Sequence, residues 1–356
     1  TLDLTLALTR GPKVFVERID IEGNATTLDE VIRRQFRTVE GDPLNPREIR
    51  QSAERIRALG FFSDAKVNAE PGSSPDQVVV NVDVEEQPTG SLTFGLSYSV
   101  ASGTGFNIGF SEKNFLGRGQ ALSLSLNSGT SNQNSSFSFT EPALLGRDLS
   151  FSVGGYYRTS DYDNAKYDTR NIGLTTGIGF PVGEQSKLDL RLRVSEDKLD
   201  NVDPASSPII QAEAVIPALK TFSLGYAYEY DNRITGLNPK GGVLLRFGQD
   251  FAGLGGDTEY IETTALALAE TKIMNEEVTV RAIFEGGAIH SLGDTSSRVT
   301  ERYFGNGKIR GFEPNGIGPR DLNAVNEDAL GGNLFAVARF EADFPLGLPE
   351  EYGITG

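Results

Sequence analysis

The stretch SLTFGLSYSV, residues 91–100, decides the fold class of this chain. Its large apolar side chains alternate with Thr, Gly and Ser, and a period of two residues is that of a β-strand. Similar alternating segments recur near residues 106, 120, 135, 150, 172, 188, 223, 244, 260, 278 and 335. With the first segment they predict about twelve strands and no helix among them.

The two faces of these strands indicate a membrane barrel. One face is rich in Ser, Gly, Thr and Asn, whereas the other is apolar and carries aromatic residues toward the strand ends. A polar lumen, a lipid-facing outer surface and aromatic girdles are typical of outer-membrane barrels, as is the alternation of short links such as 181–186 with long ones such as 288–333. The alternative is a soluble β-sandwich, which would place a charged face outside and large apolar residues within.

Upstream of the alternation, residues 13–87 have the pattern of a small α+β domain. A strand at 13–22 precedes a first helix from about residue 28 through Phe36. Asn45 and Pro46 then form the N-cap and first residue of a second helix. Two strands, at 61–70 and 77–86, complete the order strand-helix-helix-strand-strand. Residues 1–9 alternate like the last strand of a preceding module, and Gly11-Pro12 ends that run.

The amino-acid composition and net charge argue against several classes of function. The net charge of −16 argues against nucleic-acid binding, and the absence of cysteine and the single histidine exclude thiolate chemistry and most metal sites. The run Gly305-x-Gly307-Lys308 resembles part of a phosphate loop, but the further glycine and the Ser/Thr after the lysine are missing. The sequence therefore predicts no enzyme active site, no metal and no cofactor.

Residues 301–321, ERYFGNGKIRGFEPNGIGPRD, interrupt the strand pattern. Their glycines and prolines exclude a regular helix or a central strand. The whole connection, about 288–333, is long, and ordered loops of that length are usually functional. We therefore expect a loop of fixed shape that presents Arg310 and Phe312 on either side of Gly311.

The unit that begins GPKVFVERIDIEGNATTLDEVIRRQF, followed by strands that carry FGNGKIRGFEPNGIGPRD, resembles the BamA family of outer-membrane barrel-assembly subunits. The resemblance implies an α+β POTRA domain followed by an all-β antiparallel transmembrane barrel, with about sixteen strands in the full protein and about twelve here. It divides the chain into the end of a preceding POTRA domain (1–12), the last POTRA domain (13–87) and a barrel incomplete at its C-terminus (88–356). A long loop, 289–333, enters the lumen.

The resemblance also assigns site residues. The lumen loop carries the motif Ile309, Arg310, Gly311 and Phe312, with Glu341 as its partner on the barrel wall. Alternation along 334–344 agrees, because it turns Arg339, Glu341 and Asp343 inward. The first barrel strand is implied to form a lateral gate, with residues Leu92, Phe94, Gly95, Leu96 and Tyr98.

The implied function is the folding and insertion of β-barrel proteins into the outer membrane of a Gram-negative bacterium, without covalent chemistry. Implied partners are unfolded outer-membrane clients, accessory lipoproteins, and membrane lipid with lipopolysaccharide, and the POTRA domain lies in the periplasm and binds clients or partners. The mechanism is physically sound, because an exposed strand edge can pair with an incoming strand before that strand meets hydrocarbon. The alternative is a translocation or secretion transporter of the TamA or two-partner type.

Overall fold

In the computed structural model, the described residues are 13–99, 103–129, 132–161, 165–233, 241–274, 277–293 and 296–345. The strand expected at 1–12, Val100 and the segment 346–356 lie outside them. The chain forms two compact units. The first comprises Thr1–Ser91 with Ser111–Ala121, and the second comprises Leu92–Phe110 with Leu122–Gly356.

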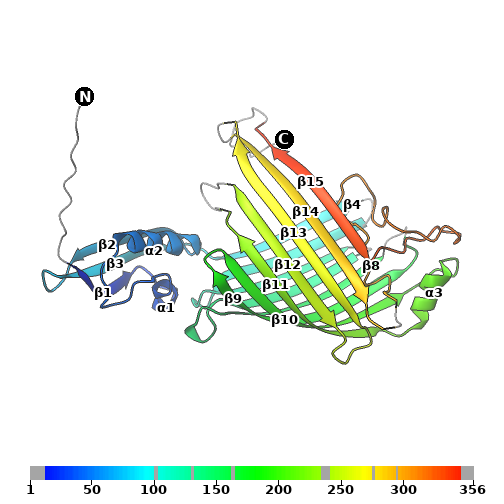
Figure 1. Ribbon diagram of the computed structural model, residues 1–356, viewed down its shortest axis with the longest axis horizontal. Helices are drawn as coiled ribbons and strands as arrows, with labels where there is room; N and C mark the ends of the chain where they lie inside the picture. Colours follow the sequence, from blue (N-terminus) through cyan, green and yellow to red (C-terminus); the bar gives the residue numbers. More distant parts are fainter. Residues whose placement is uncertain are drawn as a thin grey trace. The chain divides into compact units, whose positions relative to one another are not determined.

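The first unit contains a three-stranded sheet and two helices (Figure 1). The sheet order is β1-β3-β2, with β1 parallel and β2 antiparallel to the central β3. The predicted order strand-helix-helix-strand-strand is confirmed. The elements are β1 (Phe15–Glu22), α1 (Asp29–Arg33), α2 (Pro46–Ala58), β2 (Phe62–Pro71) and β3 (Gln77–Glu86).

The two helices close the core of this unit. The α2 helix begins as expected, because the Asn45 side chain accepts a hydrogen bond from Arg47 N at 3.0 Å and Pro46 needs no amide partner. The α1 helix ends at Arg33, so the expected continuation through Phe36 is wrong. Phe36 is nevertheless buried, since the turn after α1 still directs its ring into the core.

Glu86, at the end of β3, fixes the turn before α1. Its carboxylate accepts hydrogen bonds from Thr26 N at 3.0 Å and from Thr27 N at 2.6 Å. Partial burial alone would raise the pKa of Glu86, but the hydrogen bonds from Thr27 and Thr26 outweigh it and hold the pKa below its usual range. The ionised carboxylate therefore stabilises the folded first unit.

Replacing Glu86 by glutamine will lower the stability of the first unit by about 1–2 kcal/mol at pH 7, because charge-assisted hydrogen bonds become neutral ones. Since the folded pKa is depressed, the contribution of Glu86 is complete above its unfolded pKa of about 4.3 and is lost as the pH falls through the folded value. Hydrogen exchange of amides 24–28 in the intact protein measures the effect. The exposed neighbour Glu85, changed to glutamine, serves as control, and equal exchange in the two variants would contradict the expectation.

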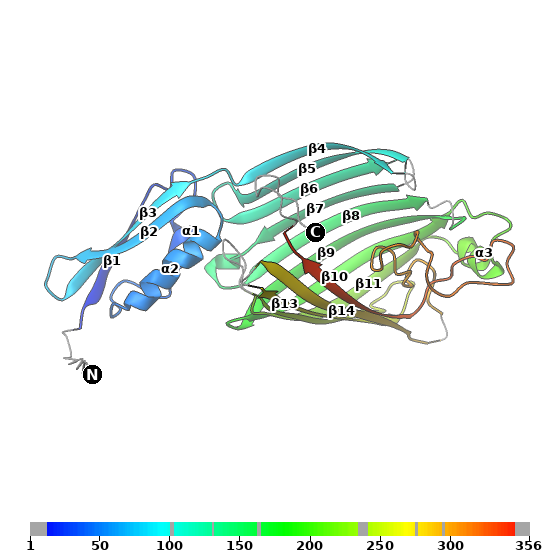
Figure 2. The same ribbon diagram turned by 90° about the horizontal axis from the view of Figure 1, so that it is seen from above.

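The second unit is a twelve-stranded antiparallel sheet in which each strand pairs with its neighbours in sequence, from β4 at one end to β15 at the other. All twelve predicted strands are present, and they curl into an incomplete barrel (Figures 1 and 2). The strands are β4 (Gly90–Ser99), β5 (Gly103–Phe115), β6 (Gln120–Gly129), β7 (Asn132–Glu141), β8 (Ser150–Asp161), β9 (Asp168–Gly183), β10 (Ser186–Asp200), β11 (Leu219–Asp231), β12 (Gly242–Ala252), β13 (Tyr260–Ile273), β14 (Val278–Ser291) and β15 (Leu334–Asp343).

The expectation of no helix among the strands is wrong. The α3 helix (Pro208–Val215) lies between β10 and β11, and a short 3-10 turn (Leu144–Gly146) follows β7. The α3 sequence PIIQAEAV is apolar almost all round, so it shows no one-sided stripe. The sequence did contain a signal for the start of α3, because Ser207 is a common N-cap residue and Pro208 suits the first helical position. In the structure the Ser207 side chain accepts a hydrogen bond from Ile209 N at 3.2 Å.

The inner face of the sheet is polar and carries paired charges. Arg191 on β10 binds Asp250 on β12, and Gly225 of the intervening β11 leaves room for the pair, because a Cβ there would meet Asp250 Oδ1 at 2.1 Å. Glu229 likewise binds Lys187, at 3.2 Å, and Arg246. Apolar side chains such as Phe284 and Phe340 are exposed on the outer face. Within the described ranges, no helix has both the length and the apolar character needed to cross a bilayer.

Candidate functional site: the loop docked on β14 and β15

The connection between β14 and β15 folds back on itself. Because β14 continues to Ser291, the connection begins at Leu292 and ends at Asn333. Its two arms are joined by a bridge in which Tyr303 and Gly332 exchange backbone hydrogen bonds of 2.9 Å, and by a second bridge between Arg320 and Ala329. This loop and α3 lie at the same end of the sheet in both views (Figures 1 and 2).

The wall beneath the loop is set by the register of β14 and β15. Gly287 pairs with Phe335, Glu285 with Val337, and Arg281 with Glu341. These residues alternate with outward Phe284 and Phe340, so they share the inner face. The loop segment 303–310 lies along this face, where Arg339 Nη1 donates to Lys308 O at 3.2 Å.

The sequence-predicted motif meets this wall at Glu341. Arg310 Nη2 lies 3.5 Å from Glu341 Oε1, yet the Arg310 side chain is 92% exposed. Glu341 also lies 3.9 Å from Arg281 Nη1, so it has a second cation nearby. Gly311, at φ +88°, takes the left-handed conformation that favours glycine. The side chains of Ile309 and Phe312, on either side of Arg310 and Gly311, are both exposed. The geometry thus brings Arg310 to Glu341 and leaves Phe312 facing solvent.

The sequence-predicted gate strand is β4, which lies at one end of the sheet order with only β5 beside it among the described strands. A Cβ at Gly95 would meet Asn107 Oδ1 of β5 at 2.0 Å, so glycine here lets a polar side chain of β5 cover the strand. The four large gate side chains are exposed on one face of β4: Leu92, Phe94, Leu96 and Tyr98. Within the part of the chain that the structure describes, β4 therefore has an exposed apolar face and pairs on one side with β5.

A contact that the sequence reasoning missed joins Lys308 to β14. Lys308 Nζ binds Glu285 Oε1, and Arg339 Nη2 lies 3.6 Å from the other carboxylate oxygen of Glu285. Lys308 Nζ also lies 4.8 Å from the centre of the Phe335 ring. The available signal was Glu285 itself, a carboxylate in the middle of a strand that turns its neighbour Phe284 to the opposite face.

Tyr303 makes a second contact with the wall. Its hydroxyl donates to Glu262 Oε1 on β13 at 2.8 Å, and its ring meets the Phe335 ring edge-on at 4.6 Å. Burial and the Glu262 carboxylate both raise the pKa of Tyr303, so the hydroxyl keeps its proton. Gly287 leaves room for both rings, because a Cβ there would meet Phe335 Cε1 at 2.5 Å and the Tyr303 hydroxyl at 2.8 Å.

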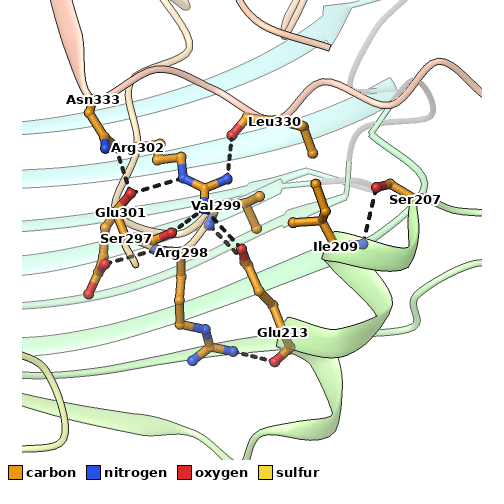
Figure 3. A network of polar contacts seen from close by, with 10 residues as sticks. All are labelled: Ser207, Ile209, Glu213, Ser297, Arg298, Val299, Glu301, Arg302, Leu330 and Asn333. Carbon is orange, nitrogen blue, oxygen red and sulfur yellow. Dashed lines mark hydrogen bonds and ion pairs between the residues drawn. The ribbon is translucent and has the colours of Figure 1, made fainter. Parts of the chain in front are cut away.

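The first part of the loop is bound to α3 by a buried polar network around Glu213 (Figure 3). Glu213 Oε2 accepts from Val299 N at 2.8 Å, and Oε1 accepts from Arg302 Nη2 at 3.2 Å. The Glu213 carbonyl oxygen accepts from Arg298 Nη2 at 2.7 Å. Arg302 also donates to Ser297 Oγ at 3.0 Å, so one glutamate and two arginines connect the helix to the loop.

Apolar packing and two aspartates complete this layer. Val299 of the loop packs with Ile210 of α3 and with the buried Tyr167. Ser207, the N-cap of α3, donates from its amide to Asp328 and from its hydroxyl to Asp321, both at 2.6 Å. The loop and α3 therefore form one packed layer, held by buried polar groups as well as by apolar contacts.

The polar groups of this arrangement bind one another and so hold the loop of the chain itself on the wall and on α3. Among the described residues, no group of three or more His, Cys, Asp or Glu side chains could hold a metal ion. Lys308, part of the apparent phosphate-loop run, is bound to a carboxylate of the wall. Among the residues named by the sequence, the apolar side chains of β4, the Arg310 side chain and the Phe312 ring are exposed.

Comparisons with known proteins agree with this architecture. Residues 114–355 match the model of the Omp85 superfamily domain, and residues 14–87 match the POTRA model described as a surface antigen variable number repeat. Similar curated proteins include the outer membrane protein assembly factors BamA of Neorickettsia risticii, 28% identical over 98% of this chain and 47% of the relative, and of Nitratidesulfovibrio vulgaris, 29% identical over 96% and 43%. The chain thus spans about half the length of these curated relatives.

Solved structures show the same fold. The crystal structure of BamA from Haemophilus ducreyi lacking POTRA domains 1–3 matches with a TM-score of 0.71 and 25% identity, over 96% of this chain and 70% of that chain. CdiB from Acinetobacter baumannii shares the fold with a TM-score of 0.58 at 12% identity, over 95% of this chain and 61% of that one. With a POTRA unit, a twelve-stranded sheet and a family match over most of its length, this chain belongs to the Omp85 superfamily.

Proposed function

We propose that this protein folds and inserts β-barrel proteins into the bacterial outer membrane. The exposed apolar face of β4 carries the proposal, because this strand ends the order of the described sheet and could pair with an incoming strand. Each unpaired backbone group costs several kcal/mol in hydrocarbon, on the order of 4–8 in water-to-cyclohexane transfer, so an incoming strand gains from a template that pairs with it first. Relatives named outer membrane protein assembly factor support the same reading.

In this proposal each domain of the chain has a separate role. Residues 13–87 form the last POTRA domain in the periplasm, and residues 88–356 form the barrel in the outer membrane of a Gram-negative bacterium. The POTRA domain binds unfolded clients or accessory lipoproteins, and β4 opens as the lateral gate at a surface of lipid and lipopolysaccharide. No covalent step and no cofactor are involved. The loop 292–333, with the motif 309–312, acts inside the lumen.

Reconstitution tests this proposal. The full-length protein, placed in liposomes, should speed the folding of unrelated outer-membrane barrels above the rate in empty liposomes. The different-class alternative is a secretion or translocation transporter of the TamA or two-partner type. Ion conductance and export of one dedicated partner, with no effect on barrel folding, would establish the transporter and reject insertion.

Arg310 and Glu341 should matter for this activity. We expect Arg310→Ala or Glu341→Ala to lower the insertion rate by about threefold to tenfold, since either change removes the contact at 3.5 Å between the motif and the wall carboxylate. Arg310→Lys keeps the charge but loses the planar fork, so it should fall between wild type and alanine. Insertion kinetics in the same liposomes measure the effect, and full activity in both alanine variants would remove Arg310 and Glu341 from the mechanism.

A further inference from the structure

The most enclosed ion pair between the segment 303–310 and the wall lies outside the predicted motif. Lys308 and Glu285 are 30% and 24% exposed, whereas Arg310 is 92% exposed. Pairs exposed to solvent contribute little because water screens them and two long side chains lose rotamer freedom. Pairs shielded from water are screened less, so the contact at Glu285 should hold the loop more strongly than the contact at Glu341.

Three residues close this contact into a triangle. Glu285 accepts Lys308 Nζ on Oε1 and has Arg339 Nη2 at 3.6 Å from Oε2. Arg339 Nη1 in turn donates to the Lys308 carbonyl oxygen at 3.2 Å. The loop is thus held at Lys308 through both its side chain and its backbone. We call Lys308, Glu285 and Arg339 the Glu285 lock.

Aromatic rings enclose the lock on one side. Lys308 Nζ lies 4.8 Å from the centre of the Phe335 ring, and the Tyr303 ring lies 4.6 Å from that same ring. A cation over an aromatic face is attracted by the ring, so Phe335 adds a second attraction for Lys308 beside Glu285. Phe335 and Arg339 are four residues apart on β15, so both side chains lie on the inner face of the strand. The strand therefore sets the distance between the ring and the second cation.

We propose that the Glu285 lock holds the loop on the barrel wall and thereby sets the position of residues 309–312, with Lys308 and Glu285 as positioning residues for insertion. Lys308 is two residues before Arg310, and on the wall Glu285 lies two inward positions from Arg281, which pairs with Glu341. A loop fixed at Lys308 can therefore deliver Arg310 to Glu341 without a strong bond there. The docking itself stands without the proposed function, but the positioning role rests on it.

The lock predicts unequal effects for its members. If Glu285 becomes glutamine, Lys308 and Arg339 face each other with no counter-charge between them, and the two cations repel. If Lys308 becomes methionine, Glu285 keeps Arg339 as its partner and the aliphatic stem still covers Phe335. Glu285→Gln should therefore release the loop more than Lys308→Met, and Arg310→Ala should release it least.

Hydrogen exchange of the peptide 303–312 in detergent-solubilised full-length protein tests this order. We expect exchange to be faster by about tenfold in Glu285→Gln, about threefold in Lys308→Met and less than about twofold in Arg310→Ala. Glu229→Gln is the matched control, because Glu229 is also a wall carboxylate between two cations, Lys187 and Arg246, but binds neither Lys308 nor Arg310. Exchange in the control should equal wild type.

An effect of Arg310→Ala larger than that of Lys308→Met, or no difference between Glu285→Gln and the control, would overturn the lock. If Glu285→Gln does not fold, Lys308→Met and Lys308→Arg decide the matter, with the arginine variant expected to restore slow exchange. Insertion is measured in parallel. A released loop with unchanged insertion would overturn the positioning role, whereas wild-type protein that inserts nothing would reject the proposed function and leave the exchange result to judge the lock.

Discussion

Replacing Glu213 by alanine will release the first part of the loop, residues 297–303, from α3. The change removes the acceptor of Val299 N and of one Arg302 nitrogen in a buried layer. Arg302 keeps Ser297 and the Leu330 carbonyl oxygen as partners. We therefore expect the free energy that holds the loop on α3 to fall by about 2–4 kcal/mol, which lies between the cost of an unmade buried hydrogen bond and the cost of a broken buried ion pair.

Hydrogen exchange of the peptides 209–216 and 297–303 measures this loss, and both peptides should exchange faster together. Glu213→Gln keeps one acceptor and should give an intermediate rate. The exposed loop residue Glu313, changed to alanine, controls for loss of charge alone. Acceleration in 297–303 without any in 209–216 would show that α3 and the loop are not one layer.

Replacing Gly287 by alanine will displace two aromatic rings. The added Cβ would lie 2.5 Å from Phe335 Cε1 and 2.8 Å from Tyr303 Cζ, closer than real contacts allow. Both rings must move, and Tyr303 then loses its hydrogen bond to Glu262. Overpacking of this kind costs about 1–3 kcal/mol, which here falls on the docked state of the loop.

The neighbouring glycine provides a matched control for this substitution. A Cβ at Gly286 would meet nothing closer than Phe335 O at 3.4 Å, so Gly286→Ala should behave as wild type. Limited chymotrypsin digestion measures the effect as the rate of cleavage after Tyr303, because release of Tyr303 exposes the peptide bond between Tyr303 and Phe304. Equal digestion of the two variants would mean that the wall adapts to the added methyl group.

The strands were predictable because alternation is a local property. A two-residue period is visible in any single segment, and the turn residues between segments fix the pairing of neighbours. The same parity placed Arg339, Glu341 and Asp343 on one face of β15, which the register of β14 and β15 bears out. The start of α2 was equally local, since it needed only Asn45 and Pro46.

The contacts of the loop were not predictable in this way. Which wall residue Lys308 meets depends on the path of the whole connection between β14 and β15, and no local pattern encodes that path. Glu341 was named only through the resemblance of the motif to a family. The α3 helix was missed because its buried partners, Val299 and Arg302, lie about 85 residues further along the chain and give its sequence no visible stripe.

The paired charges of the inner face also divide the sheet mechanically. Ion pairs join β10 to β11 and β11 to β12, and Arg281 of β14 joins Glu270 of β13 and Glu341 of β15. The Arg191–Asp250 pair spans three strands at once. On β6 and β7 the same face carries small hydroxyl contacts, such as Ser123 with Ser138 at 2.8 Å. Such contacts shift at low cost, whereas a shielded ion pair resists shear. Elastic deformation should therefore concentrate in the half of the barrel next to β4. The strands near that edge should shift more easily than the strands joined by ion pairs.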